Sequence, residues 1–181
     1  MAGASEVGGE PARLREGDPV AWEAFYERVY PMMLVYSQRR LGYNEVARDA
    51  VSEALARTVK TIARMDDLGT LPEAWCFGIL RNVVIDAQRR SYRERRIHAT
   101  ADPMSVDPSE SLELSDDHEV VRRAFAQLSD LERELLELRV VAGLSSEHVA
   151  SVLDMSPGAV RMAQARALDK LRGLMPQDLQ P

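Results

Sequence analysis

The sequence predicts an all-α protein of two small helical domains, joined by an acidic flexible linker, with a helix-turn-helix in the second domain. Three observations lead to this prediction. Apolar residues recur at helical spacing along most of the chain, and runs of β-branched residues are short. The segment from Leu144 to Arg172 has the residue pattern of two helices joined by a tight turn. Residues 101–117 carry prolines, serines and acidic side chains without a lysine or arginine, a composition too polar to form a core.

The chain of 181 residues is long enough for one domain or two small ones, and its apolar content is ordinary for a globular protein. We expect a disordered N-terminal tail, a first helical domain, the acidic linker, the helix-turn-helix domain and a short C-terminal tail. These segments cover residues 1–17, 18–98, 99–117, 118–175 and 176–181.

Start and stop signals place three helices in the first domain. Asp18 can cap a helix that has Pro19 in its first turn, and Asn44 can cap the next helix. Gly69 and Pro72 interrupt the chain before the third. The predicted helices cover about 18–41, 44–64 and 73–96, with a loop at 65–72.

The third helix ends in a run of arginines, QRRSYRERR, with five arginines between Arg89 and Arg96. Cationic side chains near a helix C-terminus complement the helix dipole, which is a purely structural explanation. The run exceeds what capping requires, so contact with nucleic-acid phosphates is the favoured interpretation. The net charge of −6 does not oppose it, because basic stretches alternate with the acidic linker.

The second domain is predicted to begin with a helix from about His118. Ser129 and Glu132 form a capping box at the next helix, whose expected buried face is Leu131, Leu135, Leu138 and Val141. Gly143 suits a left-handed residue past a helix end, and Ser145 can cap the helix that follows.

The second helix of the helix-turn-helix begins at Ser156 and Pro157 and separates into two faces. Val160, Ala167 and Leu171 share one stripe, whereas Arg161 and Arg166 point to the other side. A basic outer face is typical of a recognition helix in the major groove of DNA. The alternative is an ordinary pair of packed helices with a solvated outer face.

Several classes of protein are disfavoured. Cys76 is the single cysteine, and His98, His118 and His148 lack ligand-like spacing, so we expect no metal and no cofactor. No converging catalytic groups are visible, so we expect no enzyme. No stretch approaches the roughly 20 apolar residues that span a bilayer, and no signal peptide is visible, which favours a cytoplasmic location and no membrane partner.

Three stretches, in order, resemble one family. Asp49–Leu55 (DAVSEAL) is similar to its D-x-V-Q-E-x-F segment, and Trp75–Asp86 (WCFGILRNVVID) is close to W-L-F-x-I-A-R-N-x-x-x-D. The segment LSDLERELLELRVVAGLSSEHVASVLDMSPGAVR matches the family's C-terminal pattern. The chain thus resembles the extracytoplasmic-function (group IV) sigma factors of bacterial RNA polymerase, in the sigma-70 family, with regions 2 and 4 as its two domains.

The resemblance implies a subunit that binds core RNA polymerase, recognises the −10 and −35 promoter elements and aids promoter melting. The residues that match −35 contacts are Ser156, Pro157, Gly158, Arg161, Met162, Ala165 and Arg166. Those that match −10 contacts are Leu68, Trp75, Arg81, Asn82, Arg89 and Arg90. Trp75 fits stacking on DNA and packing in the core about equally well.

The resemblance also implies protein partners. Asp49, Ser52 and Glu53 match the surface that binds the β′ clamp helices of core polymerase, and the family's region 4 binds the β flap. An anti-sigma factor is expected from family habit alone. The chain departs from the family at Ser52, where Gln is usual, and at Leu55, where Phe is usual. The rival interpretations are a response regulator, a helical enzyme and an adaptor that binds only protein.

Overall fold

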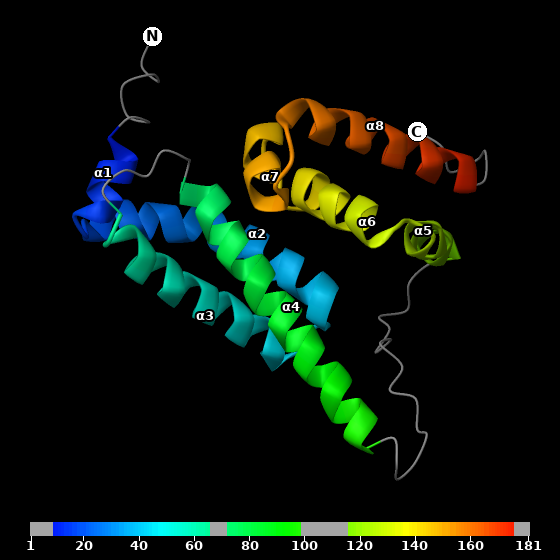
Figure 1. Cartoon of the computed structure of the whole chain (residues 1–181), viewed down its shortest axis with the longest axis horizontal. Helices are drawn as coiled ribbons and strands as arrows, with labels where there is room; N and C mark the ends of the chain where they lie inside the picture. The colour runs from blue at the N-terminus through cyan, green and yellow to red at the C-terminus, as the bar shows by residue number, and fades with distance from the viewer. Residues whose placement is uncertain (1–8, 66–71, 99–115, 176–181) are drawn as a thin grey trace.

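The computed structural model describes residues 9–65, 72–98 and 116–175, and every regular element in these ranges is a helix (Figure 1). The helices are α1 Glu10–Arg15, α2 Pro19–Leu41, α3 Glu45–Ile62, α4 Pro72–His98, α5 Asp116–Ala126, α6 Asp130–Leu136, the π-helical turn η1 Glu137–Val141, α7 Ser146–Leu153 and α8 Pro157–Leu174. The predicted all-α class with two helical domains is confirmed. Most of the predicted linker lies outside the described residues.

The expected disordered tail over residues 1–17 needs a correction, because Glu10–Arg15 forms the helix α1. Leu14 of this helix is buried, and its carbonyl oxygen accepts a hydrogen bond of 2.9 Å from Trp22 Nε1. Leu14 is the one large apolar residue of Glu10–Arg15, so the sequence of this helix shows no apolar periodicity. Its burial against α2 orders the helix.

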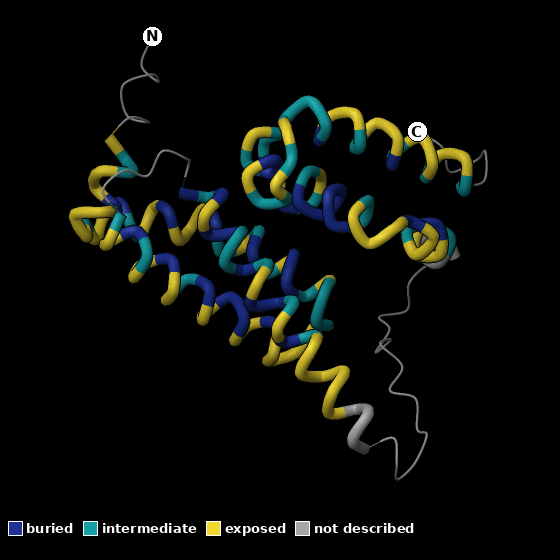
Figure 2. The backbone as a smooth tube through the Cα atoms, in the orientation of Figure 1, coloured by how far each residue is buried: buried dark blue, intermediate teal, exposed yellow. Residues whose placement is uncertain are grey.

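The first domain is a bundle in which α2, α3 and α4 all contact one another. Asp18 accepts from the amide of Val20 at 2.9 Å, and Asn44 accepts from that of Ala47 at 3.1 Å, so both predicted caps are confirmed. The buried residues of the three helices lie on the sides where the helices meet (Figure 2). They include Phe25, Met33 and Tyr36 of α2, Val51 and Ile62 of α3, and Phe77, Leu80 and Val84 of α4.

In the second domain, α6 continues into a π-helical turn, η1, that the sequence did not predict. The amide of Ala142 donates to the carbonyl oxygen of Glu137 at 2.8 Å, a separation of one residue more than in an α-helix. Leu135 and Leu138 are buried, as predicted, but Leu131 is half exposed. Leu131 lies in the first turn of α6, before the buried stretch of that helix begins.

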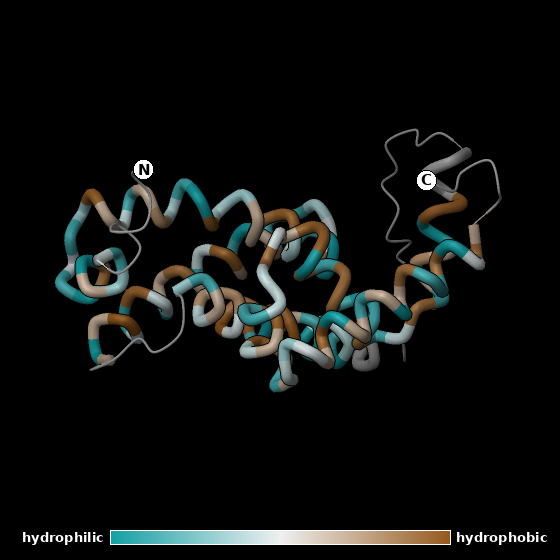
Figure 3. The backbone as a smooth tube through the Cα atoms, turned by 90° about the horizontal axis from the view of Figure 1, so that it is seen from above, coloured by the Kyte–Doolittle hydropathy of each residue, from teal (hydrophilic) through white to brown (hydrophobic). Residues whose placement is uncertain are grey.

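The helix-turn-helix consists of α7 and α8, and its local signals have the expected geometry. Ser145 accepts from the amide of His148 at 3.2 Å, and Gly143 has a φ of 65°. The turn residue Asp154 has a φ of 54°, in the left-handed region that Asp enters more easily than most residues. Apolar and hydrophilic residues alternate along both domains (Figure 3). The core of the second domain includes Leu135, Leu138, Leu144, Val149, Val160 and Ala167.

Glu132 joins the start of α6 to α8, and its charge can be tested. It accepts from the Ser129 amide at 2.8 Å and from Lys170 Nζ at 3.0 Å, and these bonds lower its pKa to about 2. A lowered pKa in the folded state stabilises the fold above the ordinary pKa of 4.5, and this stability is lost as the pH falls toward 2. We expect Glu132→Gln to lower the melting temperature at neutral pH, and the difference from wild type to shrink between pH 4.5 and 2. A difference that stays constant across this range would contradict the assignment.

Candidate nucleic-acid interface

The outer face of α8 carries the residues predicted to contact the −35 element. Val160 and Ala167 on the inner face are completely buried, so this helix packs against its domain through one side only. The opposite side faces solvent (Figure 2). Exposed there are Ser156, Arg161, Met162, Ala165 and Arg166, while Pro157 and Gly158 are half-buried.

The start of α8 is fixed by local hydrogen bonds. Ser156 Oγ accepts from the amide of Ala159 at 3.1 Å, and Pro157 occupies the first helical position, where its missing N–H leaves no donor unsatisfied. Arg139 of η1 donates to Gln164 Oε1 at 2.8 Å and also to the carbonyl oxygen of Leu144. Arg139, which was not among the residues predicted to matter, ties α8 to the helical turn before the helix-turn-helix.

Arg161 is close to one carboxylate in the absence of DNA. Its Nη1 lies 3.7 Å from Glu147 Oε1 of α7, and more than half of each side chain is exposed. Backbone and Ser145 hydrogen bonds lower the pKa of Glu147, so that carboxylate is charged at neutral pH. An exposed ion pair of this kind contributes at most about 1 kcal/mol. It is therefore a weak competitor for a phosphate or a base.

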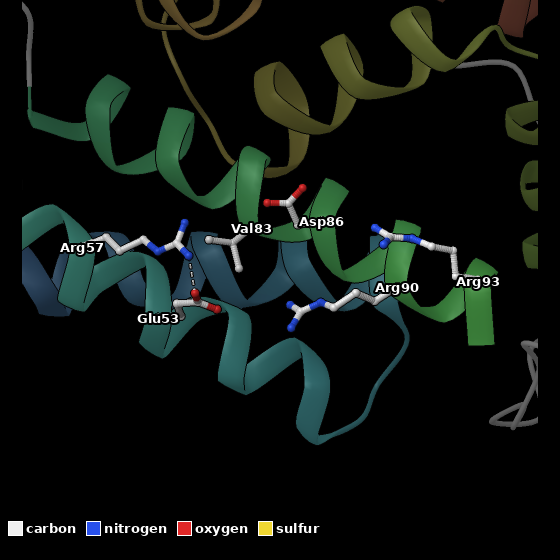
Figure 4. A pocket seen from close by; sticks show the side chains of 6 residues that line it. All are labelled: Glu53, Arg57, Val83, Asp86, Arg90 and Arg93. Carbon is white, nitrogen blue, oxygen red and sulfur yellow. Dashed lines mark hydrogen bonds and ion pairs between the residues drawn. The ribbon is translucent and has the colours of Figure 1, made fainter. Parts of the chain in front are cut away.

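A basic groove of about 340 Å³ runs between α3 and α4 in the first domain (Figure 4). Glu53 and Arg57 come from α3, and the guanidinium of Arg90 points into the gap from α4. Arg57 Nη2 donates a hydrogen bond of 2.5 Å to Glu53 Oε1, and the two side chains form an ion pair. The full lining is Glu53, Arg57, Val83, Asp86, Arg90 and Arg93. The fold thus brings a predicted polymerase contact, Glu53, beside a predicted DNA contact, Arg90.

A second groove, of about 260 Å³, lies beside the first and contains Asn82. Its other lining residues are Arg57, Lys60, Thr61 and Ile79. Arg57 and Lys60 were not among the candidate site residues predicted from the sequence. Their signal was the i, i+3 spacing of two cations on α3, which places both on one side of that helix.

The remaining predicted −10 residues do not form one surface. Arg81 pairs with Glu134 of the second domain. Arg90 follows nine residues later in α4, which places it on the opposite side of that helix, facing α3. Arg89 is exposed, with Nη1 3.9 Å from Asp86. Trp75 is 36% exposed and so lies at the surface of its domain. Leu68 lies outside the described residues.

The predicted polymerase-binding residues share the solvent-facing side of α3. Asp49, Ser52 and Glu53 are all exposed, while Ala50 and Val51 between them are buried. α3 is therefore amphipathic through this segment, and its polar side is accessible to another protein.

Within the described ranges, no three or more His, Cys, Asp or Glu side chains cluster as metal ligands would. Burial raises the pKa of the Cys76 thiol to about 11, which keeps it protonated and unreactive. None of the helices in the described part of the chain combines the length and apolarity needed to cross a bilayer.

Comparison with known proteins decides the family. A model of sigma-70 region 2 matches residues 25–94, and one of sigma-70 region 4 matches residues 118–171. The ECF RNA polymerase sigma factor ShbA of Streptomyces griseus is 35% identical over 183 residues, covering 94% of this chain and 96% of ShbA. The chain belongs to the extracytoplasmic-function sigma factors of the sigma-70 family. The sigma factor SigD of Mycobacterium tuberculosis is 33% identical over 164 residues, covering 86% of this chain and 77% of SigD.

Membership of this family establishes the general function. This sigma factor directs transcription initiation, and its partners are core RNA polymerase and promoter DNA. The family is not catalytic, in agreement with the expectation that the chain is no enzyme.

Solved structures with the same fold include complexes with anti-sigma factors. CnrH, solved with the cytosolic domain of CnrY, has a TM-score of 0.64 at 20% identity, covering 91% of this chain and 94% of CnrH. RpoE of Bartonella quintana, solved with the anti-sigma factor NepR, has a TM-score of 0.62 at 24% identity, covering 84% of this chain and 94% of RpoE. At these identities the likeness shows the shared fold.

The cap at Ser156 makes a local prediction. Ser156→Ala removes the acceptor for the Ala159 amide, a loss worth about 1 kcal/mol for an N-cap. We expect hydrogen exchange of the first-turn amides of α8 to become about fivefold faster. Ser151→Ala, at an exposed position of α7, is the control and should leave those amides unchanged. Equal rates in wild type and Ser156→Ala would show that the cap does not hold the start of α8.

Proposed function

We propose that this sigma factor recognises a promoter through two separate surfaces, α8 for the −35 element and the α3–α4 side of the first domain for the −10 element. One observation carries the proposal: α8 is buried on one side and presents two arginines on the other. An α-helix of this kind fits the major groove, where arginine is the commonest reader of guanine.

For the −35 element, the exposed face of α8 supplies both kinds of contact that a specific reader needs. Arg161 and Arg166 bind base edges or phosphates, and Met162 and Ala165 make apolar contacts with bases. Ser156, Pro157 and Gly158 lie at the N-terminus of α8, where the helix dipole favours an approaching phosphate.

For the −10 element, the two grooves between α3 and α4 support a site for single-stranded DNA. Asn82 offers hydrogen bonds to a base, and Arg57 and Lys60 beside it neutralise the backbone. Arg89 and Arg90 extend the basic surface along α4, and Trp75 offers a stacking face at its beginning. Leu68 completes the site only by family resemblance.

For core polymerase, the exposed side of α3 supports binding to the β′ clamp helices through Asp49, Ser52 and Glu53. We assign the β flap to the second domain, and an anti-sigma factor as regulator, from the family and from the complexes of its structural neighbours. Stand-alone DNA binding is weak in this proposal, because polymerase fixes the separation at which both domains reach their elements.

The experiment combines the protein with a sigma-free bacterial core polymerase and genomic promoter fragments, with run-off transcripts as the readout. We expect transcripts with wild type and a loss of more than tenfold with Arg161→Ala plus Arg166→Ala, since each base contact is worth about 1–3 kcal/mol.

The matched control is Arg122→Ala plus Arg123→Ala, which removes the same charge from α5 of the same domain. This control should retain transcription. An equal loss of transcript in both double variants would show that the α8 arginines act only through the net charge of the domain. A chain that does not bind core polymerase would reject the proposal.

A further inference from the structure

The two domains meet through a network of charged side chains. Arg81 of α4 donates twice to Glu134 of α6, from Nε at 2.8 Å and from Nη2 at 3.2 Å. Arg40 Nε of α2 donates to Glu137 Oε2 of η1 at 2.6 Å. The hydroxyl of Tyr36 also donates to Glu134, at 3.1 Å. We call these five residues the interdomain network.

The network is largely withdrawn from water. The side chains of Glu134 and Glu137 are 9% and 7% exposed, and that of Arg40 is 18% exposed. Around it α4 packs against α7, and α2 packs against η1 (Figure 1). Charges in such a contact lose much of their hydration, and their pairing must offset that loss.

The pairing does not satisfy every group in the network. Arg40 Nη2 is buried without a hydrogen bond, and the Glu134 carboxylate lies 3.9 Å from it. Burial raises the pKa of Glu137 in spite of its contact with Arg40. A buried ion network with an unsatisfied donor adds little net stability, so these ion pairs themselves contribute little to holding the domains together.

The covalent connection allows this contact to open. Residues 99–115 join α4 to α5, and a segment of 17 residues spans up to about 60 Å when extended. The connection is therefore long enough for the domains to separate without breaking the chain.

The pairs themselves indicate what the opened surface binds. A carboxylate held by the two parallel N–H groups of an arginine has the geometry that a phosphate takes in the same place. Arg40 and Arg81 reach from neighbouring helices of the first domain toward two carboxylates three residues apart on the second. In the closed chain, the guanidinium of Arg81 is paired with Glu134, although 31% of its side chain stays exposed.

We propose that Glu134 and Glu137 hold the free sigma factor closed by occupying, in place of phosphates, a DNA-backbone site formed by Arg40 and Arg81. The inference rests on the proposed function, because it assigns to the opened site the backbone of promoter DNA. It adds Arg40 as a contact and gives Arg81 two alternative partners.

The test uses the full chain without polymerase. Glu134→Gln plus Glu137→Gln keeps the size of both side chains and removes their charge. We expect a larger radius of gyration in small-angle scattering, and about tenfold tighter binding to a mixed-sequence DNA duplex at low salt. The control, Glu23→Gln plus Glu27→Gln, makes the same charge change at exposed positions of α2 and should do neither. An unchanged radius, or an equal gain in the control, would overturn the proposal.

Two further variants separate the closed state from the DNA site. Arg40→Gln breaks the network from the other domain and should also expand the chain, with circular dichroism as the check that it is folded. Added to the glutamine pair, Arg40→Gln plus Arg81→Gln should remove the gain in DNA affinity. If that gain persists and binding to core polymerase falls instead, the site belongs to polymerase and the DNA assignment is wrong. The proposed function is tested separately by run-off transcription with wild type. Normal transcription there would support it even if the DNA assignment of the Arg40 and Arg81 site is wrong.

Discussion

A largely buried contact between two carboxylates and two guanidinium groups joins the domains of this sigma factor, beside the packing of α4 against α7. Glu134 and Glu137 meet Arg81 and Arg40 there, and the consequences for the two proposed DNA-binding surfaces differ. The outer face of α8 stays exposed, whereas the guanidinium of Arg81 on α4 is held by Glu134. In the closed chain the proposed −35 surface on α8 is thus accessible, whereas Arg81, a proposed −10 contact, is engaged by the second domain.

The π-helical turn η1 connects this contact to the helix-turn-helix. Its wider hydrogen bonding begins at Glu137, the residue that pairs with Arg40, and Arg139 within the turn reaches both Gln164 and the carbonyl oxygen of Leu144. One turn therefore positions α8 on one side and contacts the first domain on the other. Interruptions of this kind are frequent at functional sites in other proteins.

Local signals in the sequence predicted most of the fold, because caps and turns act over a few residues. Asp18, Asn44, Ser129, Ser145 and Ser156 all cap the helices expected of them. Helix α1 was not predictable, since its order depends on Leu14 packing against α2. The exposed face of α8 followed from periodicity, but the partner of Arg81 did not, because Glu134 is 53 residues away in the chain. The acidic residues that mattered here lie in α6 and η1, not in the acidic linker that the charge pattern emphasised.

The central claim is that two surfaces on separate domains recognise one promoter at a distance set by polymerase. The most direct measurement is run-off transcription from a promoter in which about five base pairs, half a helical turn, are inserted between the two elements. The account predicts a loss of more than tenfold in transcription, with unchanged binding of the free protein to the −35 element alone. Transcription that tolerates the insertion would contradict it, because the two surfaces would then not be acting together.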